Sequence, residues 1–236
     1  MARPRILIVG AGFAGFHAAR ELCRLSRGRA DVAIVNPTDY FLHLPLLPEV
    51  AAGLLDPRDI TVSLPATLPS VRLVLAEASH IDFGVPGYPE VYACGDAAAA
   101  PDLTRPGEVT AMTAQHAARQ GRQVARNIAA EYGTGRRRPY KHHDLGFVVD
   151  LGGTKAAANP LRIPLHGLPA KTVTRGYHLL SLPGKRIRTA TEWLLDALLP
   201  RQTLQLGLVR SPAVPLNTAR PELPTEPVGR FRAEGS

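Results

Sequence analysis

Short runs of hydrophobic residues alternate with a helical pattern in the first third of the chain. Residues 5–9 predict a fully buried strand, and helical spacing follows a glycine-rich turn as far as about Ser26. Residues 31–35 predict a second buried strand, so the chain opens with a βαβ unit. The β-rich residues 71–76 and 91–94 predict two more strands. We expect these four strands to form one mostly parallel sheet.

Helical spacing dominates after the fourth predicted strand. Small and apolar residues recur every three or four positions over residues 110–131, which predicts one long helix. A linker rich in glycine and arginine covers residues 133–138. Beyond it, residues 145–151 predict a strand, and residues 168–182 and 187–199 predict two amphipathic helices. The expected fold class is α/β, with a Rossmann-like domain followed by a small C-terminal α+β region.

The composition is that of a globular protein. Of the 236 residues, 45% are hydrophobic, and the mean hydropathy is −0.04. No run reaches the roughly 18 apolar residues of a membrane-spanning helix. Three glycines interrupt the apolar residues 6–16 and no small-residue cleavage site follows, so we expect no signal peptide and a cytoplasmic location. The widely spaced Cys23 and Cys94 argue against a disulfide framework, a zinc ribbon or the cysteine pair of disulfide reductases, and we expect no metal site.

Positive charge is concentrated in the C-terminal part of the chain. From Arg136 onward there are 16 Lys and Arg against 7 Asp and Glu, whereas the first 135 residues hold 12 against 13. This asymmetry favours contact with a polyanion, and an anionic membrane surface is one candidate. A basic face that only contacts solvent is the alternative. No basic patch is interleaved with aromatic residues, so we expect no nucleic acid partner.

The glycine-rich turn has the spacing of a dinucleotide-binding loop. Gly10, Gly12 and Gly15 follow a buried strand and open a helix. In such a loop the first glycine permits the turn, the second lets the backbone approach a pyrophosphate, and the third lets the helix pack on the strand. The second strand ends at Asn36, where a nicotinamide dehydrogenase would carry an acid for the ribose. An amide can still hydrogen-bond a hydroxyl, but this residue weakens the case for a dehydrogenase with one NAD site.

A second motif lies after the fourth predicted strand. Residues 91–94 end in Cys94, and Gly95 and Asp96 follow directly. A strand that ends in Gly-Asp resembles the second flavin fingerprint of flavoproteins with two dinucleotide folds, in which the Asp binds the ribityl chain. The alternative is an aspartate that caps a helix. The two motifs together favour FAD over NAD.

The chain resembles the type II NADH:quinone oxidoreductases, which belong to the FAD-dependent pyridine nucleotide-disulfide oxidoreductase superfamily. The resemblance extends from Arg5 to about Arg210. The segments that carry it are Gly10–Gly15, Asp39–Val50, Tyr92–Asp96, Thr113–Gly121 and Asp144–Gly146, together with the two C-terminal helices.

This resemblance implies a flavin oxidoreductase that takes electrons from NADH and passes them through FAD to a quinone. Glu49 would lie near the flavin and Asp96 on its ribityl chain. Thr113, Ala114 and Gln115 would begin the helix aimed at the isoalloxazine, where a helix N-terminus stabilises negative charge. The predicted cofactor-binding residues are therefore Gly10, Gly12, Gly15, Asn36, Glu49, Cys94, Gly95, Asp96, Thr113 and Ala114.

The same helix would carry the quinone-binding residues. The family has two glutamines there, and Gln115 matches the first. Arg119 occupies the second position, with Gln120 beside it. These three residues are the quinone-site candidates, and an amphipathic helix whose polar residues face solvent is the alternative. The C-terminal helices would attach the protein peripherally to the inner face of the plasma membrane or form a homodimer, and the apolar arc around Trp193 fits either role.

The domain that binds NADH in the family is missing from this sequence. Only 13 residues lie between Asp82 and Asp96, no second glycine motif occurs, and residues 83–87 look like the seam of a deletion. The flavin domain would then consist of residues 1–82 and 83–135. Two hypotheses remain, namely an FAD-dependent oxidoreductase with doubtful NADH turnover and a non-catalytic flavin-fold remnant or interaction protein. The remaining expected divisions are a dimerisation or membrane-surface region at 136–210 and a Pro-rich tail at 211–236.

Overall fold

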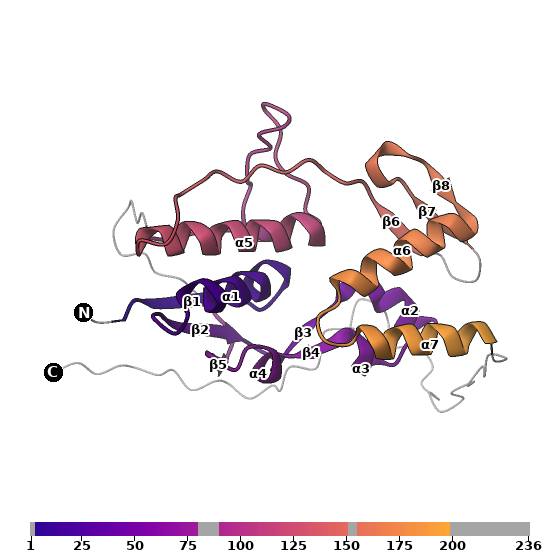
Figure 1. Ribbon diagram of the computed structural model, residues 1–236, viewed down its shortest axis with the longest axis horizontal. Helices are drawn as coiled ribbons and strands as arrows, with labels where there is room; N and C mark the ends of the chain where they lie inside the picture. Colours follow the sequence, from indigo (N-terminus) through magenta and orange to yellow (C-terminus); the bar gives the residue numbers. More distant parts are fainter. Residues whose placement is uncertain (1–2, 80–89, 151–154, 199–236) are drawn as a thin grey trace. The chain divides into compact units, whose positions relative to one another are not determined.

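The computed structural model describes residues 3–79, 90–150 and 155–198 (Figure 1). The predicted seam and the Pro-rich tail lie outside these residues. The strands are β1 (Arg5–Val9), β2 (Asp31–Asn36), β3 (Tyr40–Leu42), β4 (Thr61–Ser63), β5 (Val71–Leu75), β6 (Val148–Asp150), β7 (Ala156–Ala158) and β8 (Leu165–His166). The α-helices are α1 (Phe13–Ser26), α2 (Leu47–Ala51), α3 (Pro57–Ile60), α4 (Leu64–Thr67), α5 (Ala114–Glu131), α6 (Gly167–Ser181) and α7 (Arg186–Leu198). Short 3-10 turns lie at Leu44–Leu46, Gly95–Ala97 and Pro160–Arg162.

A parallel sheet in the order β1-β2-β5 forms the centre of the first half of the chain. Ile8 of β1 lies opposite Ile34 of β2, which in turn lies opposite Leu73 of β5. Helix α1 packs against the side chains of these residues, and α5 packs against α1 (Figure 1). The mixed fold of helices and strands with a parallel sheet is therefore confirmed, and the opening strand, helix and strand end within one residue of the predicted positions.

The fourth predicted strand of this sheet is absent from the described residues. Residues 91–94 have no strand partner, although Cys94 has an extended backbone with φ −159° and ψ 164°. Directly after these residues, the backbone N–H of Gly95 donates to the side chain of Gln120 and not to a neighbouring strand. The prediction of a strand at 91–94 was therefore wrong.

The long helix begins four residues later than its hydrophobic pattern indicated. Thr113 has an extended backbone, and its hydroxyl accepts a hydrogen bond from the N–H of His116 at 3.4 Å. A side-chain oxygen at this position satisfies one of the backbone donors that a helix N-terminus leaves free. The helix begins at Ala114, one of the three residues at which the family resemblance would begin it.

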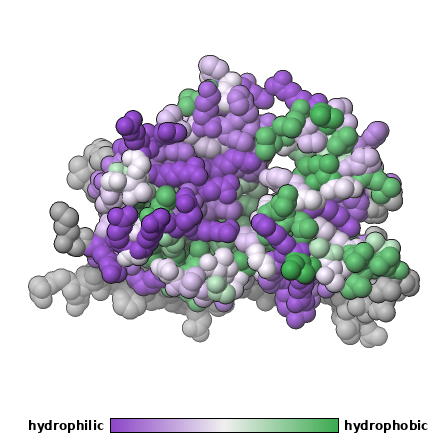
Figure 2. All heavy atoms as spheres, viewed as in Figure 1, coloured by the Kyte–Doolittle hydropathy of each residue, from purple (hydrophilic) through white to green (hydrophobic). Residues whose placement is uncertain are grey.

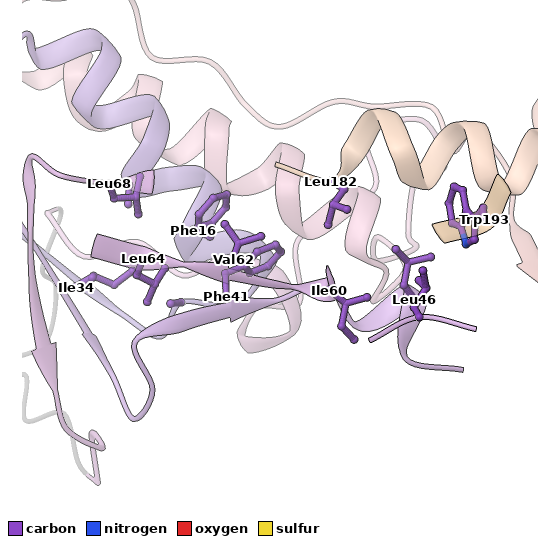
Figure 3. Packing of buried hydrophobic residues seen from close by; sticks show 13 residues of the cluster. Phe16, Ile34, Phe41, Leu46, Ile60, Val62, Leu64, Leu68, Leu182 and Trp193 are labelled. Atoms are coloured by element: carbon purple, nitrogen blue, oxygen red, sulfur yellow. The ribbon is translucent and has the colours of Figure 1, made fainter. Parts of the chain in front are cut away.

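One hydrophobic cluster joins the parallel sheet to the C-terminal helices. Phe16 of α1 stacks on Phe41 of β3, with ring centroids 4.5 Å apart. Leu182, which follows α6, and Trp193 of α7 belong to the same buried cluster (Figure 3). Burial of large apolar side chains from both halves of the chain couples their folding.

The C-terminal part contains a small antiparallel sheet in the order β6-β7-β8, with α6 packed on it through Ala156, Ala158 and Ala170. The strand predicted at 145–151 is shorter than expected, and the two predicted helices correspond to α6 and α7. None of the helices in residues 3–79, 90–150 and 155–198 combines the length and apolarity needed to cross a bilayer. The predicted division into domains stays a prediction.

Candidate functional site

The glycine turn between β1 and α1 has the geometry that its sequence spacing requires. Gly10 has φ +87°, a left-handed backbone that favours glycine. A Cβ added to Gly15 would lie 1.9 Å from the carbonyl oxygen of Gly10, so the helix can approach the turn only because this residue has no side chain. Gly12 precedes the helix with no side-chain cap, and a Cβ there would meet open space. The backbone N–H groups at the start of α1 are thus available to an anionic ligand.

Asn36 holds this turn in place from the end of β2. Its side-chain oxygen accepts a hydrogen bond from the backbone N–H of Ala11 at 2.8 Å, and its amide group donates to the carbonyl oxygen of Thr38 at 2.9 Å. The amide therefore connects the glycine turn with the segment that follows β2. An aspartate could accept from Ala11 but could not donate to Thr38.

The Gly95–Asp96 turn lies against the same end of α1. Gly95 has φ +70°, and its added Cβ would lie 3.0 Å from the Cβ of Ala14. The side chain of Gln120 is 4% exposed, and its oxygen accepts from Gly95 N–H at 2.7 Å while its amide donates to Thr110 at 2.8 Å. Gln120 therefore positions this turn from inside α5 and lies away from the other two quinone-site candidates.

These segments surround a first cavity of about 780 Å³. Ligand sites for small molecules and cofactors are usually about 300–1,000 Å³. Nine of the ten predicted cofactor-binding residues line it: Gly10, Gly12, Gly15, Asn36, Cys94, Gly95, Asp96, Thr113 and Ala114. Burial raises the pKa of Cys94, so its thiol stays protonated at neutral pH. The open backbone at Gly12 and the uncapped start of α1 suit the pyrophosphate of FAD.

Glu49, the tenth predicted residue, does not line this cavity. It lies in α2 with 4% of its surface exposed, and its carboxylate accepts a hydrogen bond from the indole N–H of Trp193. The Arg175 guanidinium lies 3.9 Å from the same carboxylate and 4.9 Å from the centre of the Trp193 ring. Burial raises the pKa of Glu49, although the Trp193 and Arg175 contacts act in the opposite direction. The structure places the side chain of Glu49, in α2, against Arg175 of α6 and Trp193 of α7.

A second cavity of about 1140 Å³ adjoins the first. Phe13, Pro45 and Ala114 line both cavities. Two of the three quinone-site candidates, Gln115 and Arg119, line the second cavity.

Gln115 is fixed by the segment before β6. Its amide group donates to the carboxylate of Asp144 and, at 3.2 Å, to the carbonyl oxygen of Gly146. Arg119 donates to the backbone oxygen of Gln115 at 3.0 Å. The same Arg119 nitrogen also lies 3.5 Å from the Gln115 side-chain oxygen. Because the Asp144 carboxylate occupies the donor side of the amide, the second lone pair of the Gln115 oxygen and the remaining Arg119 N–H groups are the groups left for a ligand.

The sequence did not single out three histidines on the wall of the second cavity. Burial, followed by Arg122 and Arg20, lowers the pKa of His17 to about 4. Burial also lowers the pKa of His43 and His178 to about 4, so all three are neutral at pH 7. They lie in α1, before α2 and in α6, and no spacing in the sequence relates them to one another.

The described residues also contain two thiols but no cluster of metal-binding side chains. Cys23 and Cys94 are free thiols. No group of three or more His, Cys, Asp or Glu side chains in residues 3–79, 90–150 and 155–198 is arranged to hold a metal ion.

Known proteins resemble this chain over a limited stretch. No protein-family model matches it. A stretch of 83 residues, 34% of the chain, is 36% identical to the type II NADH:quinone oxidoreductase NdhA of Mycobacterium tuberculosis, of which it covers 17%. An 83-residue match to the type II NADH:quinone oxidoreductase of Staphylococcus epidermidis has 30% identity and covers 21% of that protein. Over this stretch the chain is homologous to the type II NADH:quinone oxidoreductases.

The homology to these type II enzymes is narrower than the resemblance that the motifs indicated. It covers 83 residues instead of the span from Arg5 to Arg210, and it corresponds to about a fifth of the relatives' length. Among solved structures, the sulfide:quinone oxidoreductase of the hyperthermophilic bacterium Aquifex aeolicus matches 53% of this chain and 32% of its own, with 18% identity and a TM-score of 0.29.

Proposed function

We propose that this chain is an FAD-dependent oxidoreductase of the type II NADH:quinone oxidoreductase kind, with a Rossmann-like FAD domain. FAD would occupy the first cavity and a quinone the second. One observation carries this proposal. Two turns that are 80 residues apart in sequence, Gly10–Gly15 and Gly95–Asp96, line the same cavity beside the start of α5. Neither turn alone distinguishes FAD from other dinucleotides.

The residues of the first cavity have separate roles in this proposal. The uncapped N-terminus of α1 receives the pyrophosphate, where the helix dipole and free N–H groups favour negative charge. The Asp96 carboxylate accepts hydrogen bonds from hydroxyls of the ribityl chain. FAD, when bound, supplies the redox chemistry by taking two electrons from a donor and passing them to an acceptor. Thr113 and Ala114 begin α5, whose N-terminus favours negative charge near the flavin ring.

The second cavity would bind the quinone. Phe13 and Pro45 give it apolar walls, and Gln115 and Arg119 offer polar groups to a quinone oxygen. The two cavities share Phe13, Pro45 and Ala114, so a quinone in the second would lie in the cavity next to the flavin. We also propose a peripheral position on an anionic membrane surface, supported by the exposure of Ile187, Leu194 and Leu198 on α7. A homodimer through the same stripe is the alternative.

Anaerobic reoxidation tests the proposal. The FAD-loaded protein is reduced with one equivalent of dithionite and mixed with a short-chain quinone, and flavin absorbance is followed. We expect saturable reoxidation that Gln115→Leu slows without changing FAD content. Gln123→Leu is the matched control, because this glutamine lies on α5 but does not line the second cavity. Reoxidation no faster than that of free reduced FAD would contradict the proposal.

A further inference from the structure

Cations dominate the polar wall of the second cavity. No aspartate or glutamate is among the described residues that line it. In Figure 2 hydrophilic residues gather on the face over α1 and α5. The cations come from α1, from α5, and from the first turn of α7 and the residue before it, and they are Arg20, Arg119, Arg122, Lys185, Arg186 and Arg188.

Most of this positive charge has no carboxylate beside it. Arg188 pairs with the buried Asp59 at 2.6 Å. Arg119 donates to a backbone oxygen instead, and Arg122 contacts the ring nitrogen of His17 at 3.5 Å. Within residues 3–79, 90–150 and 155–198, no carboxylate lies within 4.0 Å of Arg20, Arg119 or Arg122.

The arginines of α1 and α5 are close enough to repel one another. Burial, followed by the charge of Arg119, lowers the pKa of Arg122; Arg126 and Arg20 contribute in the same direction, while the charge of Glu21 acts in the opposite direction. The charges of Arg122 and Arg20 also lower the pKa of His17 and help to keep it neutral. The folded chain therefore holds like charges together at a cost in free energy, and a bound anion would offset that cost.

Apolar side chains border the cations. Leu180 is 70% exposed and Ile187 is 84% exposed, and both line the cavity together with Tyr177. The volume of about 1140 Å³ exceeds what an inorganic ion would fill. Charge and apolar surface on one wall suit an anion that carries an organic group.

We propose that the second cavity binds a phosphate ester, with its phosphate at Arg20 and Arg122 and its organic group toward Leu180 and Ile187. Guanidinium groups bind phosphate oxygens through paired, charge-assisted hydrogen bonds, which suits arginine better than lysine at this place. The ester can come from the headgroup of an acidic phospholipid or from a soluble metabolite. This inference does not depend on FAD or quinone binding, because it rests on the cations and the apolar residues that line the cavity.

Binding is measured on the full chain without FAD. The soluble probe is glycerol phosphate, and the lipid probes are vesicles of phosphatidylglycerol and of phosphatidylcholine. We expect glycerol phosphate, phosphatidylglycerol vesicles or both to bind, and Arg20→Gln with Arg122→Gln to weaken that binding at least about tenfold. Arg5→Gln with Arg72→Gln removes the same charge from exposed strand positions outside the cavity and should change binding less than about twofold.

The pattern of binding identifies the source of the ester. Binding of glycerol phosphate alone indicates a soluble ester, and binding of phosphatidylglycerol vesicles alone indicates a headgroup. Failure of both probes would overturn the inference, as would an equal loss in the two double variants. Binding of phosphatidylcholine as tight as that of phosphatidylglycerol would overturn it too.

His17 gives a second readout that does not depend on a variant. A bound phosphate should raise the pKa of His17 from about 4, because it neutralises Arg20 and Arg122. An NMR titration of the wild-type chain with the probe that binds measures this shift. An unchanged His17 at saturation would place the phosphate elsewhere and overturn the assignment.

Discussion

At the scale of single residues, Gly15 lies where a side chain has no room. Its added Cβ would meet a backbone oxygen at 1.9 Å, and backbone cannot move aside as a flexible side chain can. We expect Gly15→Ala to lower the free energy of unfolding by about 1–3 kcal/mol, measured by urea denaturation. The control is Gly176→Ala in the exposed part of α6, where a Cβ meets nothing within 4 Å. Alanine there should stabilise by about 0.5–1 kcal/mol. Equal effects at both glycines would contradict this explanation.

The buried carboxylate of Glu49 makes stability depend on pH. Burial raises the pKa of Glu49 above its ordinary value of 4.5. Its contribution is therefore fully present below that value and is lost as the pH rises through the raised pKa. Glu49→Gln keeps an oxygen for the indole N–H of Trp193 but carries no charge. The free energy of unfolding should therefore fall less between about pH 5 and about pH 8 in this variant than in the wild type.

Glu77→Gln is the control for this pH dependence, because Glu77 is exposed. An equal change in the free energy of unfolding between the two pH values in wild type, Glu49→Gln and Glu77→Gln would show that the pKa of Glu49 is not raised.

The sequence motifs predicted single residues well where the predicted feature was a backbone conformation. Gly10 and Gly15 lie in the turn between β1 and α1 that their spacing indicated, because a short turn between a strand and a helix is a local feature. Asp96 lies in a 3-10 turn, but the strand expected before it is absent from the described residues. Glu49 is different. Its surroundings consist of Arg175 and Trp193, which are more than 120 residues away in sequence, and a single sequence contains no information on that contact.

At the scale of elements, α7 presents two unlike sides. Trp193 is 6% exposed and belongs to the main hydrophobic cluster, whereas Leu194 next to it is 58% exposed. Trp193→Ala should lower the free energy of unfolding by about 3–5 kcal/mol, since it leaves a cavity and removes the partner of Glu49.

Leu194→Ala should change the free energy of unfolding by less than about 0.5 kcal/mol, measured in the same urea titration. The predicted apolar arc therefore divides into a buried anchor and an exposed stripe. A large loss of stability for Leu194→Ala would show that the stripe is covered in solution, for example in a homodimer.

The hydrophobic patterns predicted an element correctly where its local sequence alone determines it. Helices α1 and α6 end close to the predicted positions because their spacing is continuous and turns follow them. The strand predicted at residues 91–94 failed, since a strand also needs a neighbour with free backbone groups. The side chain of Gln120 accepts the hydrogen bond that the Gly95 N–H donates, and nothing in the local sequence of either residue predicts that contact.

At the scale of the whole molecule, the missing glycine motif bears on the electron donor. Hydride transfer requires the nicotinamide ring to be held close to the flavin, and small misplacements are costly. We expect NADH to reduce the FAD-loaded chain far more slowly than dithionite does in stopped-flow experiments. Rapid, saturable reduction by NADH would reveal a nicotinamide site formed by residues that the motifs did not identify.

The first cavity should retain FAD through dialysis. Purified protein is titrated with FAD, and the bound fraction is measured after dialysis for wild type, Asp96→Ala and Asp102→Ala. Asp96 lines the first cavity, whereas Asp102 lies outside it and hydrogen-bonds Thr104. We expect wild type and Asp102→Ala to retain FAD and Asp96→Ala to retain about tenfold less, because it loses a charged acceptor for the ribityl hydroxyls. Wild-type protein that remains free of FAD after reconstitution would contradict the account.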